Sequence, residues 1–262
     1  MPYAQLRGRR VFFVDAGARD APPVVLLHGL GASAEDWDYQ IPVFAQRFRV
    51  IAIDFAGFGR SDRRGPYGVR SFARDVWLLL EQLDIRRFVL MGHSMGGAVA
   101  QEMALEQPLR ITHLVLANTM PSFVPETLDH QFMLWSRLMI MSVLGPARLA
   151  EAMSVKLFPS DEHLALRERV IRRGRTNVRS AYLASVWSLT RWSARHRLHT
   201  LGMPVLLVAA EHDYFSRADF ERFKEAMPSG ARMEIIPGTR HALPLERPDL
   251  FNARVLSFLG AA

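Results

Sequence analysis

The sequence lacks two kinds of feature that would have narrowed its function. The 262 residues include no cysteine, which excludes disulfides, thiolate metal sites and a cysteine nucleophile together. No apolar run of signal-peptide length follows the N-terminus, and no window approaches the apolar length that a membrane span needs. We therefore expect a cytoplasmic protein with no export signal and no membrane span.

Lysine is also scarce. Of the 33 basic residues only Lys156 and Lys224 are lysines, which leaves 31 arginines in a chain of formal net charge +7. Residues 121–200 hold 12 basic and 6 acidic residues, a net of +6, so the other segments hold 21 and 20, a net of +1. Such an excess suits an anionic partner or simply solvated helix faces, and we favour the latter. No interleaved aromatic and basic motif accompanies it, so we expect no nucleic-acid partner.

Short apolar runs recur along the chain, as in strands that are buried on both faces. They occupy residues 24–27, 50–53, 88–91, 114–117 and 205–208. Helix-like stretches lie between them, such as residues 71–83, with Ser71 as a candidate N-cap, and residues 95–107. This alternation predicts an α/β protein, with a mostly parallel sheet flanked by helices.

The alternation stops after Asn118 and resumes near residue 203. Helical patterns rich in Met, Leu, Trp and Arg fill the interval, broken by Gly145-Pro146 and Pro159. We predict a core domain of residues 1–120 and 201–262 and an inserted helical lid of residues 121–200. The lid's arginines should mostly face solvent. Some of its apolar side chains should wall a pocket for an apolar ester, although most should form the lid's own core. The candidates for the pocket are Trp135, Met139, Trp187 and, from the core domain, Leu243.

A serine stands at a turn between a strand and a helix. Gly92-His93-Ser94-Met95-Gly96 fits the pattern G-x-S-x-G, and its glycines suit the crowded backbone of such a turn. The helix that follows offers unpaired N–H groups to developing negative charge. We therefore predict that Ser94 is a nucleophile. His93, inside the turn, should face away from Ser94 and be structural.

A serine hydroxyl needs a base, and a base in such a site needs a carboxylate. In a strand–turn–helix site of this kind the partners follow in the order serine, acid, histidine. Asp213 comes just after the strand run that begins at residue 205, and His241 closes the loop predicted for residues 237–241. We predict Ser94, Asp213 and His241 as a catalytic triad. Glu211 is the alternative acid, and Asp219 is a weaker one.

A second glycine turn follows the first apolar run. His28-Gly29-Leu30-Gly31 brings backbone close to the predicted site. The N–H groups of Leu30 and Met95 would then bind the oxyanion that develops on a substrate carbonyl.

Together these residues resemble the α/β-hydrolase superfamily, in its lid-bearing esterase and lactonase-like branch. The matching segments span nearly the whole chain in family order: His28-Gly29-Leu30-Gly31, Asp54-Phe55-Ala56-Gly57-Phe58-Gly59-Arg60-Ser61-Asp62, Gly92-His93-Ser94-Met95-Gly96-Gly97, Asp213 and His241. The resemblance implies the α/β-hydrolase fold and a serine esterase that needs no metal or cofactor. It assigns Asp54 and its neighbours to the floor of the site, without a chemical role.

Three departures narrow the branch. Serine at residue 94 argues against haloalkane dehalogenases and epoxide hydrolases, which resemble this family but have aspartate there. Ala242, directly after His241, argues against C–C bond hydrolases. Leu30 argues against haloperoxidases and perhydrolases. Hydrolysis of lactones or thioesters on the same triad, perhydrolysis as a side activity, and a receptor-like protein that only binds a ligand stay open as alternatives. Oligomeric state cannot be read from the sequence.

Overall fold

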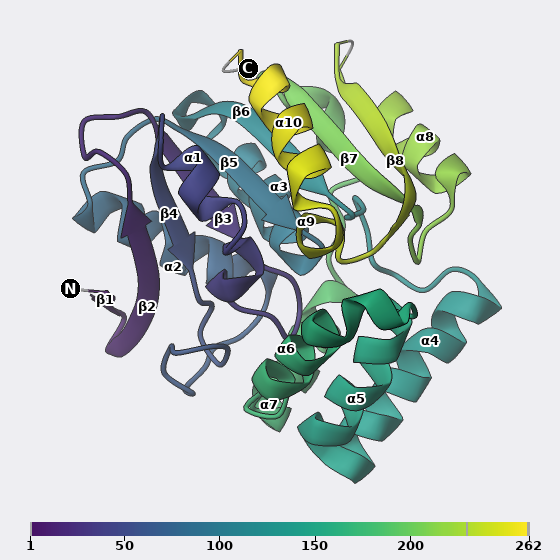
Figure 1. The fold of residues 1–262 in the computed structure, drawn as a ribbon. Coiled ribbons are helices and arrows are strands. Elements are labelled where there is room, and N and C mark those ends of the chain that lie inside the picture. Colours follow the sequence, from purple (N-terminus) through teal and green to yellow (C-terminus); the bar gives the residue numbers. More distant parts are fainter. Residues whose placement is uncertain (1, 229, 261–262) are drawn as a thin grey trace.

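A computed structural model describes residues 2–228 and 230–260, so the extreme ends of the predicted core domain lie outside it. Within these residues eight strands form one sheet in the order β1-β2-β4-β3-β5-β6-β7-β8. Strands β1 and β2 are antiparallel to their neighbours, and the other pairs are parallel. Helices cover both faces of the sheet (Figure 1). The predicted α/β class, with a mostly parallel sheet flanked by helices, is confirmed.

The elements have the following bounds. The strands are β1 (Tyr3–Leu6), β2 (Arg9–Ala16), β3 (Pro23–Leu27), β4 (Arg49–Ile53), β5 (Phe88–His93), β6 (Ile111–Ala117), β7 (Val205–His212) and β8 (Arg232–Arg240). The α-helices are α1 (Ile41–Phe44), α2 (Val69–Gln82), α3 (Met95–Glu106), α4 (Leu128–Met139), α5 (Gly145–Leu157), α6 (Leu164–Gly174), α7 (Arg179–Leu189), α8 (Arg217–Glu225), α9 (Leu243–Glu246) and α10 (Pro248–Phe258). A 3₁₀ turn, η1 (Ala34–Trp37), and a π-helical turn, η3 (Ile140–Leu144), also bear on the site.

The five predicted apolar runs are β3 to β7, and two local predictions are wrong. Helix α2 begins at Val69, so Ser71 lies inside it; the Ser71 hydroxyl donates to the Pro66 carbonyl instead (2.9 Å). The strand expected to end near residue 236 continues to Arg240, because it keeps pairing with β7 as far as His212.

Alternate residues of the central strands enter two different cores. Val24 packs on one face with α1 and α10, whereas Val25 packs on the other with α2 and α3. Because successive side chains of a strand point to opposite faces, a strand covered on both sides has to be apolar throughout. This is why the runs were legible in the sequence.

Helices α4 to α7 lie between β6 and β7 and gather at one end of the sheet (Figure 1). In the described part of this segment the only strand-like pairing is a bridge between Ser122 and Ser193, which joins its two ends. We call residues 121–200 the insertion. That it acts as a lid domain stays a prediction.

Helix α4, η3 and α5 follow one another without an intervening loop, as a run of helical residues, Leu128–Leu157, whose backbone breaks at Gly145 (φ 84°, ψ −178°). Among the described residues this run is the one that is long and apolar enough to cross a membrane, by length and composition alone. The core helix of a soluble protein passes the same test, so the absence of a membrane span stays a prediction. Met141 and Leu149 of this run are nevertheless buried inside the protein.

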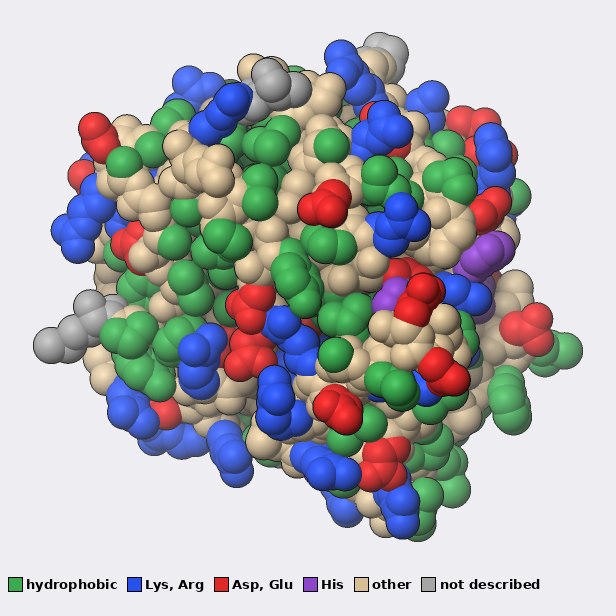
Figure 2. Space-filling view, viewed as in Figure 1, with side chains coloured by type: hydrophobic (Ala, Val, Ile, Leu, Met, Phe, Trp, Pro, Cys, Tyr) green, Lys and Arg blue, Asp and Glu red, His purple; other side chains and the backbone are tan. Residues whose placement is uncertain are grey.

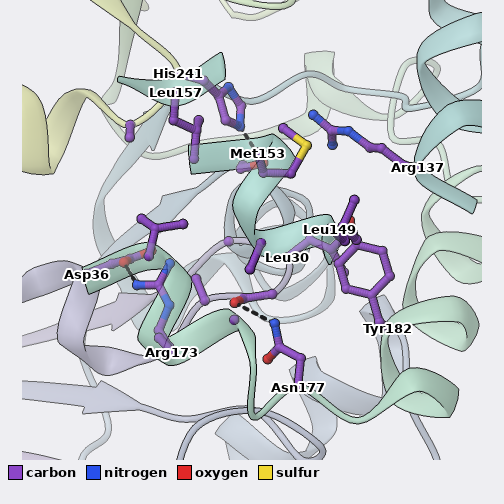
Figure 3. Close-up of a pocket in the computed structure, with 18 of the residues that line it drawn as sticks. Leu30, Asp36, Arg137, Leu149, Met153, Leu157, Arg173, Asn177, Tyr182 and His241 are labelled. Carbon is purple, nitrogen blue, oxygen red and sulfur yellow. Dashed lines mark hydrogen bonds and ion pairs between the residues drawn. The ribbon is translucent and has the colours of Figure 1, made fainter. Parts of the chain in front are cut away.

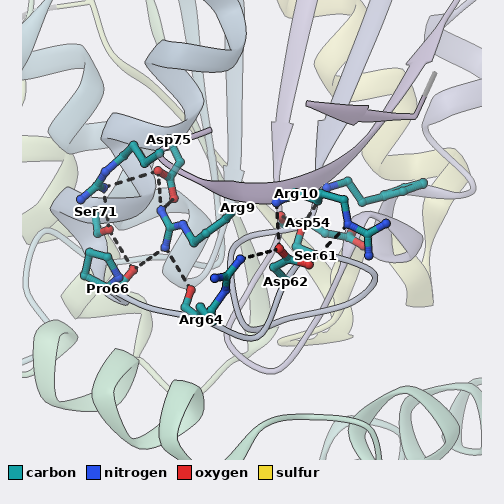
Figure 4. Close-up of polar contacts among 11 residues, drawn as sticks. Arg9, Arg10, Asp54, Ser61, Asp62, Arg64, Pro66, Ser71 and Asp75 are labelled. Atoms are coloured by element: carbon teal, nitrogen blue, oxygen red, sulfur yellow. Dashed lines mark hydrogen bonds and ion pairs between the residues drawn. The ribbon is translucent and has the colours of Figure 1, made fainter. Parts of the chain in front are cut away.

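A buried ion pair ties β2 to α2 (Figure 4). The Arg9 guanidinium donates to both carboxylate oxygens of Asp75 (2.8 and 2.7 Å), and both side chains are almost wholly buried. Arg9 also donates to the carbonyls of Arg64 and Pro66, which holds the loop before α2. Burying two charges is costly, so the pair matters most when one partner is removed.

We predict that Asp75→Ala lowers the free energy of unfolding by about 3–5 kcal/mol, because it leaves the Arg9 cation buried and unpaired. The double variant Arg9→Met with Asp75→Leu should cost less than this single change. Arg86→Ala is the control; it breaks an exposed pair with Asp84 and should cost less than about 0.5 kcal/mol. Urea denaturation of the four proteins tests the prediction, and a double variant less stable than Asp75→Ala would contradict it.

Candidate active site

Ser94 alone makes the turn between β5 and α3. Its backbone has φ 53° and ψ −117°, a conformation that is strained for a residue with a side chain. A Cβ on Gly92 would lie 2.3 Å from the Gly96 carbonyl oxygen, and one on Gly96 would lie 2.2 Å from that of Leu27. Only glycine fits at either position, so the two glycines of the motif are what let Ser94 turn.

The structure brings the three predicted triad residues together. His241 Nε2 lies 2.9 Å from Ser94 Oγ, and His241 Nδ1 lies 2.6 Å from Asp213 Oδ1. The Asp213 carboxylate is fully buried and also accepts from Asn118 Nδ2 (2.6 Å) and the Tyr214 N–H (2.5 Å). With Nδ1 donating to the carboxylate, Nε2 is left to accept the serine proton, an assignment made from the partners.

The alternative carboxylates lie elsewhere. Glu211 is half-exposed and accepts from the Gly238 N–H (2.8 Å). Asp219 forms the capping box of α8 with Ser216. Neither is hydrogen-bonded to His241, so the geometry favours Asp213 as the partner of the imidazole.

His93 lies closer to the site than expected. Its ring centroid is 5.1 Å from that of His241, and its Nε2–H donates to the His241 carbonyl (2.7 Å). It lines the same cavity as Ser94, so the expectation that it only faces away is wrong. Burial, and then the neighbouring His241, lower the pKa of His93 to about 4. A neutral His93 therefore helps to hold the backbone of His241.

The two predicted oxyanion amides are available. Met95 is the first residue of α3, where N–H groups have no acceptor within the helix. In the part of the chain that the structure describes, neither the Met95 nor the Leu30 amide donates to a protein acceptor. Their catalytic role stays a prediction.

Two side chains, those of His28 and Asn177, hold the turn that carries Leu30. The His28 Nδ1–H donates to the Gly29 carbonyl (2.7 Å), and His28 Nε2 accepts from the Phe55 N–H (3.0 Å). From the insertion, Asn177 Nδ2 donates to the Gly31 carbonyl (2.9 Å). Sequence reasoning assigned no role to His28, Asn177 or Asn118. Asn118 had a signal, since it directly follows the run that became β6.

An open cavity lies over Ser94 and His241, between the core and the insertion. Figure 3 shows its side chains. Leu30 and Leu245 line it from the core, and Met141, Leu149 and Met153 line it from the insertion. The insertion therefore walls the cavity with apolar side chains, as expected, but with different residues from those predicted. In the described chain no three His, Asp or Glu side chains are grouped to hold a metal ion.

None of the four predicted pocket residues lines this cavity. Trp135, Met139 and Trp187 are 64%, 58% and 64% exposed, and Leu243 is buried in the core on the face of α10. Trp135 and Met139 lie on one face of α4 together with the exposed Leu128 and Phe132. That face points to solvent, so Trp135 and Met139 belong neither to the pocket nor to the core of the insertion.

The basic residues are dispersed where the surface can be seen. Figure 2 shows Lys and Arg side chains interspersed with Asp and Glu, rather than gathered into one patch. Two arginines of the insertion, Arg137 and Arg173, line the Ser94 cavity.

Comparisons with known proteins agree with this geometry. Residues 22–248 match the family described as alpha/beta hydrolase fold. A protein of Agrobacterium fabrum, provisionally named the carbamate hydrolase RutD, is 30% identical to this chain. The aligned region covers 92% of this chain and 94% of that protein. The enol-lactonase from Burkholderia xenovorans has a TM-score of 0.90 at 26% identity, covering 99% of this chain and 100% of that one. A hydrolase from Pseudomonas aeruginosa has a TM-score of 0.88 at 27% identity, covering 99% and 98%.

The buried His93 predicts a loss of stability on acidification. Its pKa is about 4 in the folded protein and near 6.5 when unfolded, so below pH 6.5 the unfolded state binds a proton that the folded state refuses. The stability that depends on a neutral His93 is full above pH 6.5 and falls as the pH drops towards 4, by at most about 3 kcal/mol. His93→Gln should lose less over this interval than the wild type.

Urea unfolding at pH 7.5, 6.0 and 4.5 measures the difference. The control is His196→Gln, a change of an exposed insertion histidine, which should follow the wild type. Equal slopes for the wild type and His93→Gln would show that His93 does not titrate in this way.

Proposed function

We propose that this chain, which belongs to the alpha/beta hydrolase fold family, is a serine hydrolase that cleaves carboxylic esters through an acyl-enzyme. The observation that carries the proposal is the continuous hydrogen-bonded series from Ser94 through His241 to Asp213, at the floor of an apolar cavity. A ligand-binding protein without catalysis would have no need for a nucleophile, a base and a carboxylate that are hydrogen-bonded in series. A cytoplasmic location stays a prediction.

In the acylation step Ser94 Oγ attacks the acyl carbon and its proton passes to His241 Nε2. The imidazolium that forms is stabilised by Asp213, which stays ionised. The carbonyl electrons move to oxygen, and the amides of Leu30 and Met95 would hold this oxyanion. When the tetrahedral intermediate collapses, the C–O bond to the alcohol breaks and His241 returns the proton to the leaving oxygen.

Deacylation repeats these steps with water as the nucleophile. His241 takes a proton from water, and the resulting hydroxide oxygen bonds to the acyl carbon. The bond between the acyl carbon and Ser94 Oγ then breaks, and His241 returns the proton to Ser94 Oγ. The products are the carboxylic acid and the free enzyme.

Lactone hydrolysis is the second candidate. It uses the same attack on an acyl carbon, but the leaving alcohol stays attached to the acid. The likeness to the enol-lactonase, over both whole chains, favours it. The relative named as a carbamate hydrolase points to another acyl carbonyl, that of a carbamate. None of these substrates requires a different set of residues.

Ser94→Ala should abolish labelling by a fluorophosphonate probe and hydrolysis of p-nitrophenyl butyrate, because no other group at the cavity is set to form the acyl-enzyme. The fold and the Tm should stay nearly unchanged. Ser180→Ala, which changes an exposed serine of α7, is the matched control and should label and hydrolyse as the wild type does. Substantial turnover by pure Ser94→Ala protein would refute Ser94 as the nucleophile.

Asp213→Asn should reduce kcat by up to about four orders of magnitude, by comparison with other serine triads, because an amide favours the wrong imidazole tautomer. Glu211→Gln is the matched control, since it removes a carboxylate two residues away that accepts from the Gly238 N–H and not from His241. Steady-state kinetics on p-nitrophenyl butyrate tests both. A crippled Glu211→Gln beside an active Asp213→Asn would identify Glu211 as the acid.

A further inference from the structure

The guanidinium of Arg137 enters the Ser94 cavity without an ionic partner. Figure 3 shows it pointing from α4 into the cavity towards Met153. Its Nε and Nη2 atoms are buried and have no hydrogen-bond partner. In the described residues no carboxylate lies within 4.0 Å of it, as a salt bridge would require.

The other arginine of the cavity is different. Arg173 is paired with Asp36, and the two side chains are almost equally buried. Asp36 is the one carboxylate among the residues that line the cavity, and Arg173 cancels it. The charge that remains at the wall of the cavity is that of Arg137.

The surroundings of Arg137 offset its burial only in part. Its Cζ lies 4.8 Å from the ring centroid of Tyr214, and the Lys156 ammonium lies 5.0 Å from the same centroid. The Tyr214 ring in turn packs against His241, at 4.3 Å between centroids. A ring face attracts a cation, but less strongly than an anion does. Two cations on one ring also repel each other, so the site would gain from a negative charge.

Arg137 also stands at a junction. It lines a second, apolar hollow beside the Ser94 cavity, which we call the side hollow; its walls include Phe123, Met133, Leu134, Val186, Leu189 and Phe215. Leu30, whose amide is predicted to hold the oxyanion, lines both spaces. A group bound at Arg137 would therefore belong to the same ligand that reaches Ser94.

We propose that Arg137 binds a carboxylate of the substrate, so that the preferred esters or lactones are monoanions with an apolar stem. This rests on the proposed function and names its substrate class. A carboxylate fits because one planar guanidinium can bind it through two parallel hydrogen bonds. Arg137 lines the Ser94 cavity and Lys156 does not, so the cavity wall offers one unpaired cation and matches a single negative charge, whereas a dianion would need more donors.

Paired substrates test the proposal. The anionic series is the mono-p-nitrophenyl esters of succinate, glutarate and adipate. Each has a neutral counterpart of the same shape, in which an isopropyl group replaces the carboxylate. The readout is the ratio of kcat/KM for the anionic ester to that for its neutral counterpart, which cancels differences in enzyme quality.

The wild type should favour the anion by about ten- to hundredfold at one chain length, the range expected for a hydrogen bond to a charged group. Arg137→Gln should bring the ratio to about one or below, and Arg137→Lys should restore part of it. Arg172→Gln removes one positive charge from an exposed position of α6 and should keep the wild-type ratio. A wild-type ratio near one at every length, or a ratio that survives Arg137→Gln, would overturn the proposal.

Binding to Ser94→Ala protein separates this proposal from the proposed function. By calorimetry, monomethyl glutarate should bind more tightly than dimethyl glutarate, and adding Arg137→Gln should remove the difference. If that result comes with an enzyme that hydrolyses no ester, the anion site stands and the proposed function fails. If the enzyme hydrolyses esters but neither assay distinguishes anionic from neutral ligands, the proposed function stands and the anion site fails. A large fall in Tm for Arg137→Gln with an unchanged charge preference would make Arg137 structural and overturn the proposal.

Discussion

The sharp turn of the backbone at Ser94 is the constraint on which the site depends. It brings α3 directly back from the end of β5, so closely that Gly92 and Gly96 cannot carry a side chain. The strands β4, β3, β5, β6, β7 and β8 are parallel. The segments that follow β3, β6, β7 and β8 therefore begin at this same edge of the sheet. They supply the Leu30 turn, Asn118, Asp213 and His241. One tight turn in a parallel sheet thus places Ser94 where the segments that follow β6, β7 and β8 bring Asn118, Asp213 and His241 together.

The residues that this topology brings together could be predicted from the sequence. Asp213 and His241 were found because their places follow from the ends of buried strands, and buried strands are continuous apolar runs. Asp213 and Glu211 both lie at the end of β7, so the sequence alone left both as candidate acids. The path of the chain after Ala210 decides which carboxylate meets the imidazole, and the structure favours Asp213. His93 was misplaced because a pattern shows that a turn exists but not how its side chains rotate.

The insertion was legible as helical but not in its orientation. Trp135 and Arg137 lie two positions apart on α4, so they project to different sides of the helix. Composition predicts the tryptophan inside and the arginine outside, yet Trp135 is 64% exposed and Arg137 reaches the cavity. An apolar stripe in the sequence indicates that a helix has one apolar and one polar face. Which face turns inward depends on what the core presents, and here the inward face places the Arg137 guanidinium at the wall of the Ser94 cavity.

The insertion is not held equally along its length. Helix α6 is fastened to the turn after β3 by two ion pairs, Arg169 with Asp38 and Arg173 with Asp36. Helix α4, in contrast, has no fully buried residue, and its outer face is apolar and exposed. Segments with few buried contacts open at the lowest free energy. The wall that carries Arg137 is therefore the less constrained one, and a substrate anion bound there would supply the contact between α4 and the core that Arg173 already supplies for α6.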